Sequence, residues 1–190
     1  MEKTWILDRC KTVLLSAIFF LNGAALSFAG DLNSFQGISI PATPFDRKIS
    51  RTGVLTDNPM EDQNRAEQGS FESLFWRARS FRYCADHNGD YWQTPQETEN
   101  NGSGDCEDKA VWLYANLKQN GYANVRLVIG KYRSFETRYH VWVTYTDQTG
   151  ATYLLDPAIQ KRVWKAGDFS QGFYKPVYSF DGQNRYRHPA

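Results

Sequence analysis

The sequence predicts an α+β domain in which helices pack on an antiparallel sheet. Apolar residues recur every three or four positions over two segments, 63–83 and 105–121, which is typical of one face of a helix. Beyond them the spacing changes to two in three segments that we expect to be strands, 125–129, 139–145 and 151–156. Helices followed by a run of strands with short connections indicate an α+β architecture.

Length and composition indicate one globular domain with short additions. The chain has 190 residues, of which 41% are hydrophobic and 23% charged, and this balance excludes wholesale disorder. Its 22 basic and 21 acidic residues leave a formal charge of +1, so no overall field exists to attract a polyanion. We therefore expect no nucleic-acid partner.

Residues 1–29 have the pattern of a secretory signal peptide. Three basic residues precede an apolar run at 13–21, and small residues at Ser27 and Ala29 precede Gly30. The apolar run is shorter than the ~20 residues that a membrane span needs, although an uncleaved anchor is the alternative. We expect a periplasmic or secreted protein with no membrane span after cleavage, which would carry 19 basic and 19 acidic residues.

The rest of the chain divides into an arm and a domain. Residues 30–62 hold three prolines and scattered charges, which predicts an extended N-terminal arm, and residues 63–190 form the expected domain. Within it, 92–97 is expected to be a loop or short turn and 99–105 a glycine-containing loop. The aromatic segment 164–190 is expected to be irregular and to pack across the sheet.

The helix predicted over 105–121 has clear signals at both ends. Asp105 is suited to the N-cap position, and Asp108 stands three residues later, where a capping box places an acceptor. Gly121 stands where a glycine commonly ends a helix. Cys106 consequently falls in the first helical turn, where the helix dipole and free N–H groups favour negative charge.

Cys106, His140 and Asp156 have the placement that thiol catalysis requires. A thiol nucleophile needs a base within reach, and the base needs an acceptor that orients it. A hairpin turn at 147–150 would bring position 140 of one strand near 156–157 of the next. N–H groups at the helix start could also bind an oxyanion. The three residues therefore predict a Cys–His–Asp site.

Each of these residues also has an ordinary interpretation. A histidine in a strand is often core or surface filler, and an aspartate before proline often starts a turn. In an oxidising compartment Cys106 could instead pair with Cys84 in a disulfide. The alternative for Cys84 is burial at a helix end next to Phe81.

Four short motifs, spread over about residues 70–160, carry a resemblance to a known family. They are 92–95 (Trp-Gln-Thr-Pro), 104–108 (Gly-Asp-Cys-Glu-Asp), 140–143 (His-Val-Trp-Val) and 153–157 (Tyr-Leu-Leu-Asp-Pro). This pattern resembles the bacterial transglutaminase-like cysteine proteinases, the LapG-type periplasmic enzymes that cleave large surface adhesins.

The resemblance implies a papain-like or transglutaminase-like α+β fold. It also implies that Cys106 is the nucleophile, His140 the base and Asp156 the orienting acid. The implied partner is a protein substrate, with a surface adhesin as one candidate. The same three residues would support transamidation if an amine replaced water, and a non-catalytic binding module of the same fold is the other alternative.

Acidic residues on both sides of Cys106 oppose its ionisation. A carboxylate ~5 Å from a thiolate, at an effective dielectric constant of ~20, costs ~3 kcal/mol, or ~2 pKa units. A helix N-terminus returns only ~1 kcal/mol. A bound Ca²⁺ would offset the acids, and the resemblance implies Asp105 and Glu107 as its ligands.

The remaining ligands of such a calcium site stay open. Asp90, Asn100, Asn101 and loop carbonyls could complete the shell. The alternative is that Asp105 and Asp108 are only helix-capping acids that point away from the thiol. Zinc is disfavoured, because the sequence holds no Cys/His cluster with zinc-ligand spacing.

Overall fold

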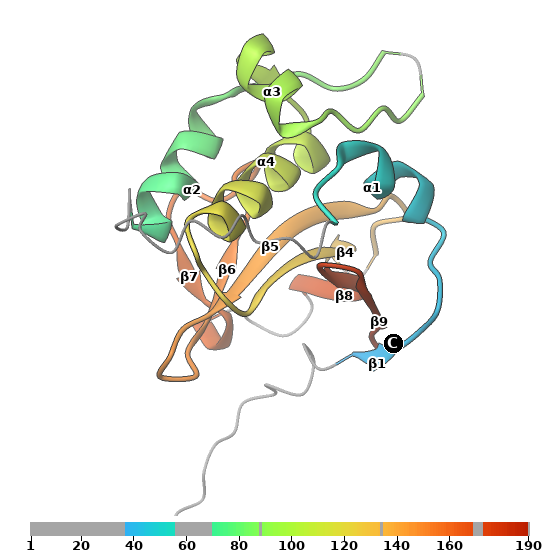
Figure 1. Ribbon diagram of the computed structural model, residues 1–190, viewed down its shortest axis with the longest axis vertical. Coiled ribbons are helices and arrows are strands. Elements are labelled where there is room, and N and C mark those ends of the chain that lie inside the picture. Colours follow the sequence, from blue (N-terminus) through green and yellow to red (C-terminus); the bar gives the residue numbers. More distant parts are fainter. Residues whose placement is uncertain (1–36, 56–69, 88, 134, 169–172, 190) are drawn as a thin grey trace, which may run out of the picture.

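A computed structural model of the chain describes residues 37–55, 70–87, 89–133, 135–168 and 173–189 (Figure 1). The predicted signal peptide lies outside these residues. Among the described residues, no helix combines the length and apolar character needed to cross a membrane.

The helices of the described residues gather beside one face of a sheet (Figure 1). They are α1 (Asp46–Thr52), α2 (Phe71–Ser80), α3 (Pro95–Asn101) and α4 (Cys106–Gln119), with a short 3-10 turn at Ala166–Asp168. α4 contacts α2, α3 and the strands β4 and β5. It is thus the central helix of the domain.

An antiparallel sheet in the order β1-β9-β8-β4-β5-β6-β7 forms the other layer. Its strands are β1 (Ile38–Ser39), β4 (Val125–Arg133), β5 (His140–Thr146), β6 (Thr152–Leu155), β7 (Trp164–Lys165), β8 (Phe173–Asp181) and β9 (Asn184–Arg187). A separate parallel pair, β2 (Arg82–Tyr83) with β3 (Ser103–Gly104), precedes α4.

Alternation along the central strands sends side chains into two clusters. Leu127, Val143 and Phe180 pack with the buried face of α4 and with Phe75 of α2 in the main core. The opposite face of the sheet carries a smaller cluster, formed by Val128, Trp142, Leu154 and Tyr174 with Tyr132 against it. β5 therefore contributes to both clusters, because successive residues of a strand face opposite sides.

The predicted α+β fold is confirmed. α4 begins and ends within two residues of the predicted helix, and β5 and β6 match two predicted strands to within one residue at each end. β4 begins where the first strand was predicted but continues to Arg133, four residues beyond the predicted end. The helix predicted over 63–83 is found as α2, Phe71–Ser80, with Ser70 as its N-cap; residues 63–69 lie outside the described ones.

The prediction of a loop or short turn over 92–97 and of a loop over 99–105 is wrong where α3 (Pro95–Asn101) occupies the end of the first segment and the start of the second. The Thr94 side chain and Glu97 form a capping box, and Pro95 stands at the first helical position. Gly102, with φ of 57°, ends the helix in the left-handed conformation that glycine adopts at low cost. These capping signals lie within the segment itself, so the sequence alone was sufficient to predict this helix.

The prediction that 164–190 is irregular is also wrong. The segment forms β7, β8 and β9, and β8 lies in the middle of the sheet against β4. Pro176 argues against a central strand, because proline cannot donate to the ladder. The structure accommodates it at a register shift, where Gly130 pairs with Pro176 but Ile129 pairs with Tyr178.

The described part of the predicted extended arm is not simply extended. β1 adds to the edge of the sheet by pairing with β9, and α1 packs its buried Ile49 into the main core. The Asp46 carboxylate also accepts a hydrogen bond from Arg185 Nε at 2.8 Å. Tertiary contacts fold this segment onto the domain, which local sequence pattern does not indicate.

Candidate active site

Cys106 is the first residue of α4, and a buried carboxylate fixes that helix start. Asp108 accepts hydrogen bonds from the Asp105 N–H at 3.2 Å and from both the backbone and side-chain nitrogens of Gln93 at 2.8 Å. A Cβ on Gly104 would lie only 2.5 Å from the Asp108 Cβ, so glycine is needed there. The predicted capping box is present, and it also holds the preceding loop.

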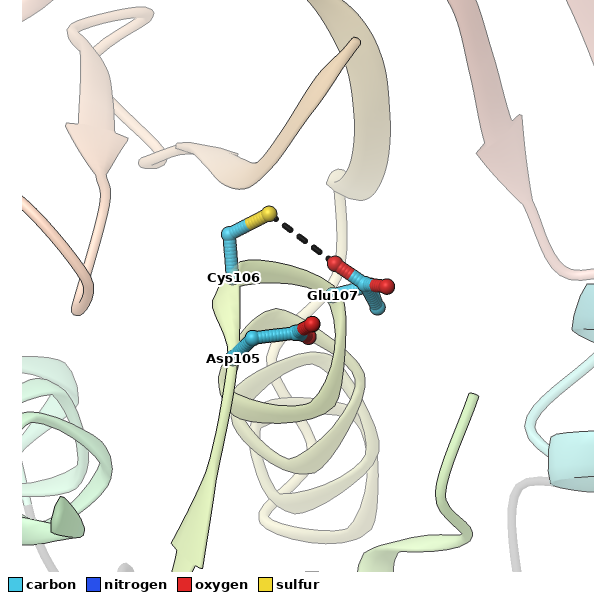
Figure 2. Close-up of side chains that lie close together, drawn as sticks. All are labelled: Asp105, Cys106 and Glu107. Carbon is cyan, nitrogen blue, oxygen red and sulfur yellow. Dashed lines mark hydrogen bonds between the residues drawn. The ribbon is translucent and has the colours of Figure 1, made fainter. Parts of the chain in front are cut away.

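The thiol of Cys106 points toward a carboxylate of its own helix (Figure 2). Its Sγ donates to Glu107 Oε2 at 3.0 Å. Burial raises the pKa of the Cys106 thiol, and Glu107 and Asp105 raise it further, whereas the Val141 backbone opposes the rise. As it stands, this surrounding favours the neutral thiol.

Asp105, Cys106 and Glu107 form an acidic cluster, with one ligand atom from each within 4.8 Å of the others. Asp105 and Glu107 are buried, and Asp105 Oδ1 has no hydrogen-bond partner among the described residues. Burial, with the neighbouring Asp105, raises the pKa of Glu107 to about 9. Burial also raises the pKa of Asp105. These carboxylates therefore lack enough donors to stabilise their charge.

Two further carboxylates approach the cluster. Asp86 and Asp90, from the turn before α3, bring oxygen atoms within 4.8 Å of one another and of Glu107. Asp90 was expected as a ligand from the sequence and Asp86 was not, although both stand in the turn-forming stretch 86–90. Asn100 and Asn101, the other candidates, bond to Gln96 and Gln93 through their side chains.

His140 and Asp156 meet at the strand ends. His140 Nε2 lies 2.6 Å from Asp156 Oδ2, and Asp156 is fully buried. The other oxygen, Oδ1, accepts the backbone N–H groups of Ala158 and Ile159 at 3.0 and 3.2 Å. The turn that follows β6 supplies these two donors. A carboxylate that accepts at Nε2 holds the proton there and leaves Nδ1 as the basic nitrogen.

Tyr174 is a neighbour of Asp156 that the sequence did not predict. Its hydroxyl donates to Asp156 Oδ2 at 2.8 Å, so that oxygen serves both His140 and Tyr174. The residue belongs to β8, in the segment that was expected to be irregular. No local signal identifies it, because its role depends on strand order in the sheet.

Lys109 links the two halves of the site, the helix half around Cys106 and the sheet half around His140 and Asp156. It is buried one turn after Cys106, and its ammonium donates to the carbonyl oxygens of Arg79 at 3.3 Å and of Pro157 at 3.5 Å. α4 is thereby tied to the turn that carries Asp156. The structure thus joins His140 to Asp156 directly, and it sets the Cys106 thiol beside the backbone of Val141, the residue after His140.

Both cysteines of the described residues are free thiols. The alternative of a disulfide between Cys84 and Cys106 is therefore not what the structure shows. Cys84 is exposed, which corrects the expectation that it is buried near Phe81.

Comparisons with known proteins extend the resemblance to three dimensions. No family model and no curated protein matches the chain. Among solved structures, LapG of Legionella pneumophila matches with a TM-score of 0.55 and 23% identity over 77% of this chain and 81% of that one. Its calcium-bound form gives a TM-score of 0.53, and its EGTA-treated form gives 0.55.

A likeness at this identity is evidence for the shared fold. The alignment covers 77% of a chain whose described residues form the helices and the antiparallel sheet given above. The chain therefore has the fold of LapG, as the sequence motifs led us to expect.

Proposed function

We propose that the protein is an exported cysteine peptidase that cleaves a peptide bond in a protein substrate. The observation that carries the proposal is the 2.6 Å contact between His140 Nε2 and the fully buried Asp156. It supports a tautomer in which Nδ1 is free to act as a base. The fold shared with LapG and the position of Cys106 at a helix start add to this support.

In the proposed reaction, Nδ1 of His140 takes the proton of the Cys106 thiol as sulfur attacks the substrate carbonyl carbon. Backbone N–H groups at the start of α4 would stabilise the resulting oxyanion. The C–N bond then breaks, the leaving amine takes the proton from Nδ1, and a thioester remains on Cys106. Water, deprotonated by His140, attacks the thioester, which releases a carboxylic acid and restores the thiol.

The acidic cluster fits a divalent cation of the calcium type. Carboxylate oxygens are the ligands that Ca²⁺ prefers, and Asp105 Oδ1 is a buried acceptor with no donor among the described residues. Asp105 and Glu107 would hold the ion, with Asp86 and Asp90 close enough to Glu107 to contribute. When bound, Ca²⁺ would supply positive charge that offsets the acids around the thiol.

A peptide library tests the proposal. The purified protein and a Cys106→Ser variant would be incubated with a digest of a bacterial proteome, with calcium and with chelator, and new peptide termini read by mass spectrometry. Cleavage by the wild type alone is the expected result. A library left intact by the wild type under every condition would contradict it.

The same incubation with added putrescine separates the alternatives. Amine incorporation in place of cleavage would indicate a transamidase, and neither reaction would favour a non-catalytic module. The resemblance to adhesin-cleaving enzymes makes a large surface adhesin the first natural substrate to try.

A further inference from the structure

The Tyr174 hydroxyl completes the surroundings of Asp156. It donates to Oδ2 at 2.8 Å, the oxygen that also faces His140 Nε2 at 2.6 Å. Both Tyr174 and Asp156 are buried. Burial, together with the adjacent Asp156, raises the pKa of the Tyr174 hydroxyl, so it stays protonated and acts as a donor.

A register shift in β8 brings Tyr174 to this position. Gly130 of β4 pairs with Pro176, whereas Ile129 pairs with Tyr178, so one residue of β8 is unmatched between them. The shift changes the alternation of side chains along β8. Tyr174 consequently lies in the cluster with Trp142, while Tyr178 packs on the main core.

The backbone of Tyr174 is strained. Its φ is 51°, in the left-handed region, where a bulky aromatic residue is a genuine outlier. Such a conformation is energetically unfavourable and persists where surrounding contacts hold it. Here the ring packs against Tyr132 at 5.1 Å and Trp142 at 5.3 Å between centroids, and the hydroxyl reaches Asp156.

We propose that Tyr174 is a positioning residue that holds Asp156 Oδ2 toward His140, an inference that rests on the proposed function. The phenol fixes the direction of the carboxylate and stabilises its charge, because hydrogen bonds to ions are stronger than neutral ones. The proton of the imidazole therefore stays on Nε2, and Nδ1 stays available for the thiol proton.

A Tyr174→Phe variant tests this role, since it removes one oxygen and keeps the ring. The matched control is Tyr178→Phe, which removes a hydroxyl from the same strand on the other face of the sheet. His140→Ala reports separately on the proposed function. Two readouts would be taken with calcium present: the iodoacetamide labelling rate of Cys106 at pH 7, and the tautomer of His140 from long-range ¹H–¹⁵N spectra.

We expect Tyr174→Phe to lower the labelling rate about tenfold, the loss of one hydrogen bond to a charged group, and to weaken the Nε2–H signal of His140. Tyr178→Phe should change neither. If His140→Ala slows labelling but Tyr174→Phe labels like the wild type, the role of Tyr174 is refuted while the proposed function stands. If His140→Ala itself has no effect on labelling, the proposed function fails, and this inference with it. Equal losses of labelling rate in both tyrosine variants would mean that the two hydroxyls matter only for packing. This result would also refute the positioning role of Tyr174.

Discussion

Buried carboxylates have opposite surroundings in the sheet half and in the helix half of the site. On the sheet, Asp156 is fully buried, and its two oxygens meet four hydrogen-bonding groups, from His140, Tyr174 and two backbone N–H groups. At the start of α4, Asp105 and Glu107 are also buried, but they face each other and a thiol.

The difference shows where the chain supplies donors for a buried carboxylate and where it does not. The sheet half is complete with the chain's own donors, and a buried ion that is fully hydrogen-bonded is tolerated. The helix half leaves Asp105 Oδ1 unpartnered among the described residues and raises the pKa of Glu107 to about 9. The first half is therefore organised by folding alone, and the second fits an external cation.

The largest expected effect comes from breaking the sheet half with Asp156→Asn. The amide cannot accept at both positions where the carboxylate does, so the imidazole would lose its preferred tautomer. We expect peptide cleavage to fall about 10³-fold or more, as when the orienting acid of a triad is replaced. The measurement is turnover of a peptide identified in the library experiment.

Asp147→Asn is the matched control for that variant. Asp147 Oδ1 also accepts several bonds, from Thr149 and Ala151, but in an exposed hairpin turn. It should leave turnover unchanged. Full turnover by Asp156→Asn would remove Asp156 from the mechanism.

A second prediction concerns the packing that supports the sheet half. In Gly130→Ala, the new Cβ would lie 2.1 Å from the Lys175 carbonyl oxygen and 2.5 Å from the Trp142 ring. Because the first contact is with backbone, β4 and β8 must separate, and we expect a loss of about 3 kcal/mol in the free energy of unfolding. Urea unfolding measures it.

Gly167→Ala serves as the comparison, because nothing lies within 4 Å of the added Cβ. Its unfolding midpoint should stay close to that of the wild type. Indistinguishable midpoints for the two variants would show that β4 and β8 do not need their close approach.

The third and smallest expected effect is the stabilisation of the protein by calcium bound at the helix half of the site. Calcium should stabilise the wild type by about 2.7 kcal/mol at a concentration 100 times its Kd, and Asp105→Asn should remove most of that gain. In EGTA the same variant should be no less stable than the wild type, because it removes a buried carboxylate whose Oδ1 has no hydrogen-bond donor among the described residues. Thermal unfolding with calcium and with EGTA measures both.

Asp168→Asn, at an exposed acid outside the cluster, should keep the full response to calcium. A wild type that unfolds at the same temperature in calcium and in EGTA would mean that the cluster binds no calcium under these conditions.

Local patterns in the sequence determined the central helix of this protein and the three strands that follow it. Helical spacing and capping signals predicted α4 with Cys106 in its first turn, and alternation predicted β4, β5 and β6 with His140 and Asp156 at their ends. These predictions hold because periodicity and capping act between residues only a few positions apart. The hairpin between β5 and β6 is local as well, so the approach of His140 to Asp156 was predictable.

Only the tertiary structure decided what surrounds those residues. Tyr174 reaches Asp156 because β8 inserts beside β4 with a shifted register, and Asp86 reaches Glu107 because its loop folds over the start of α4. Pro176 is unfavourable in the middle of a sheet, so the sequence did not indicate the strand that carries Tyr174. These contacts join segments far apart in the chain, and their pairing follows from burial of the whole sheet and core, which no short stretch of sequence encodes.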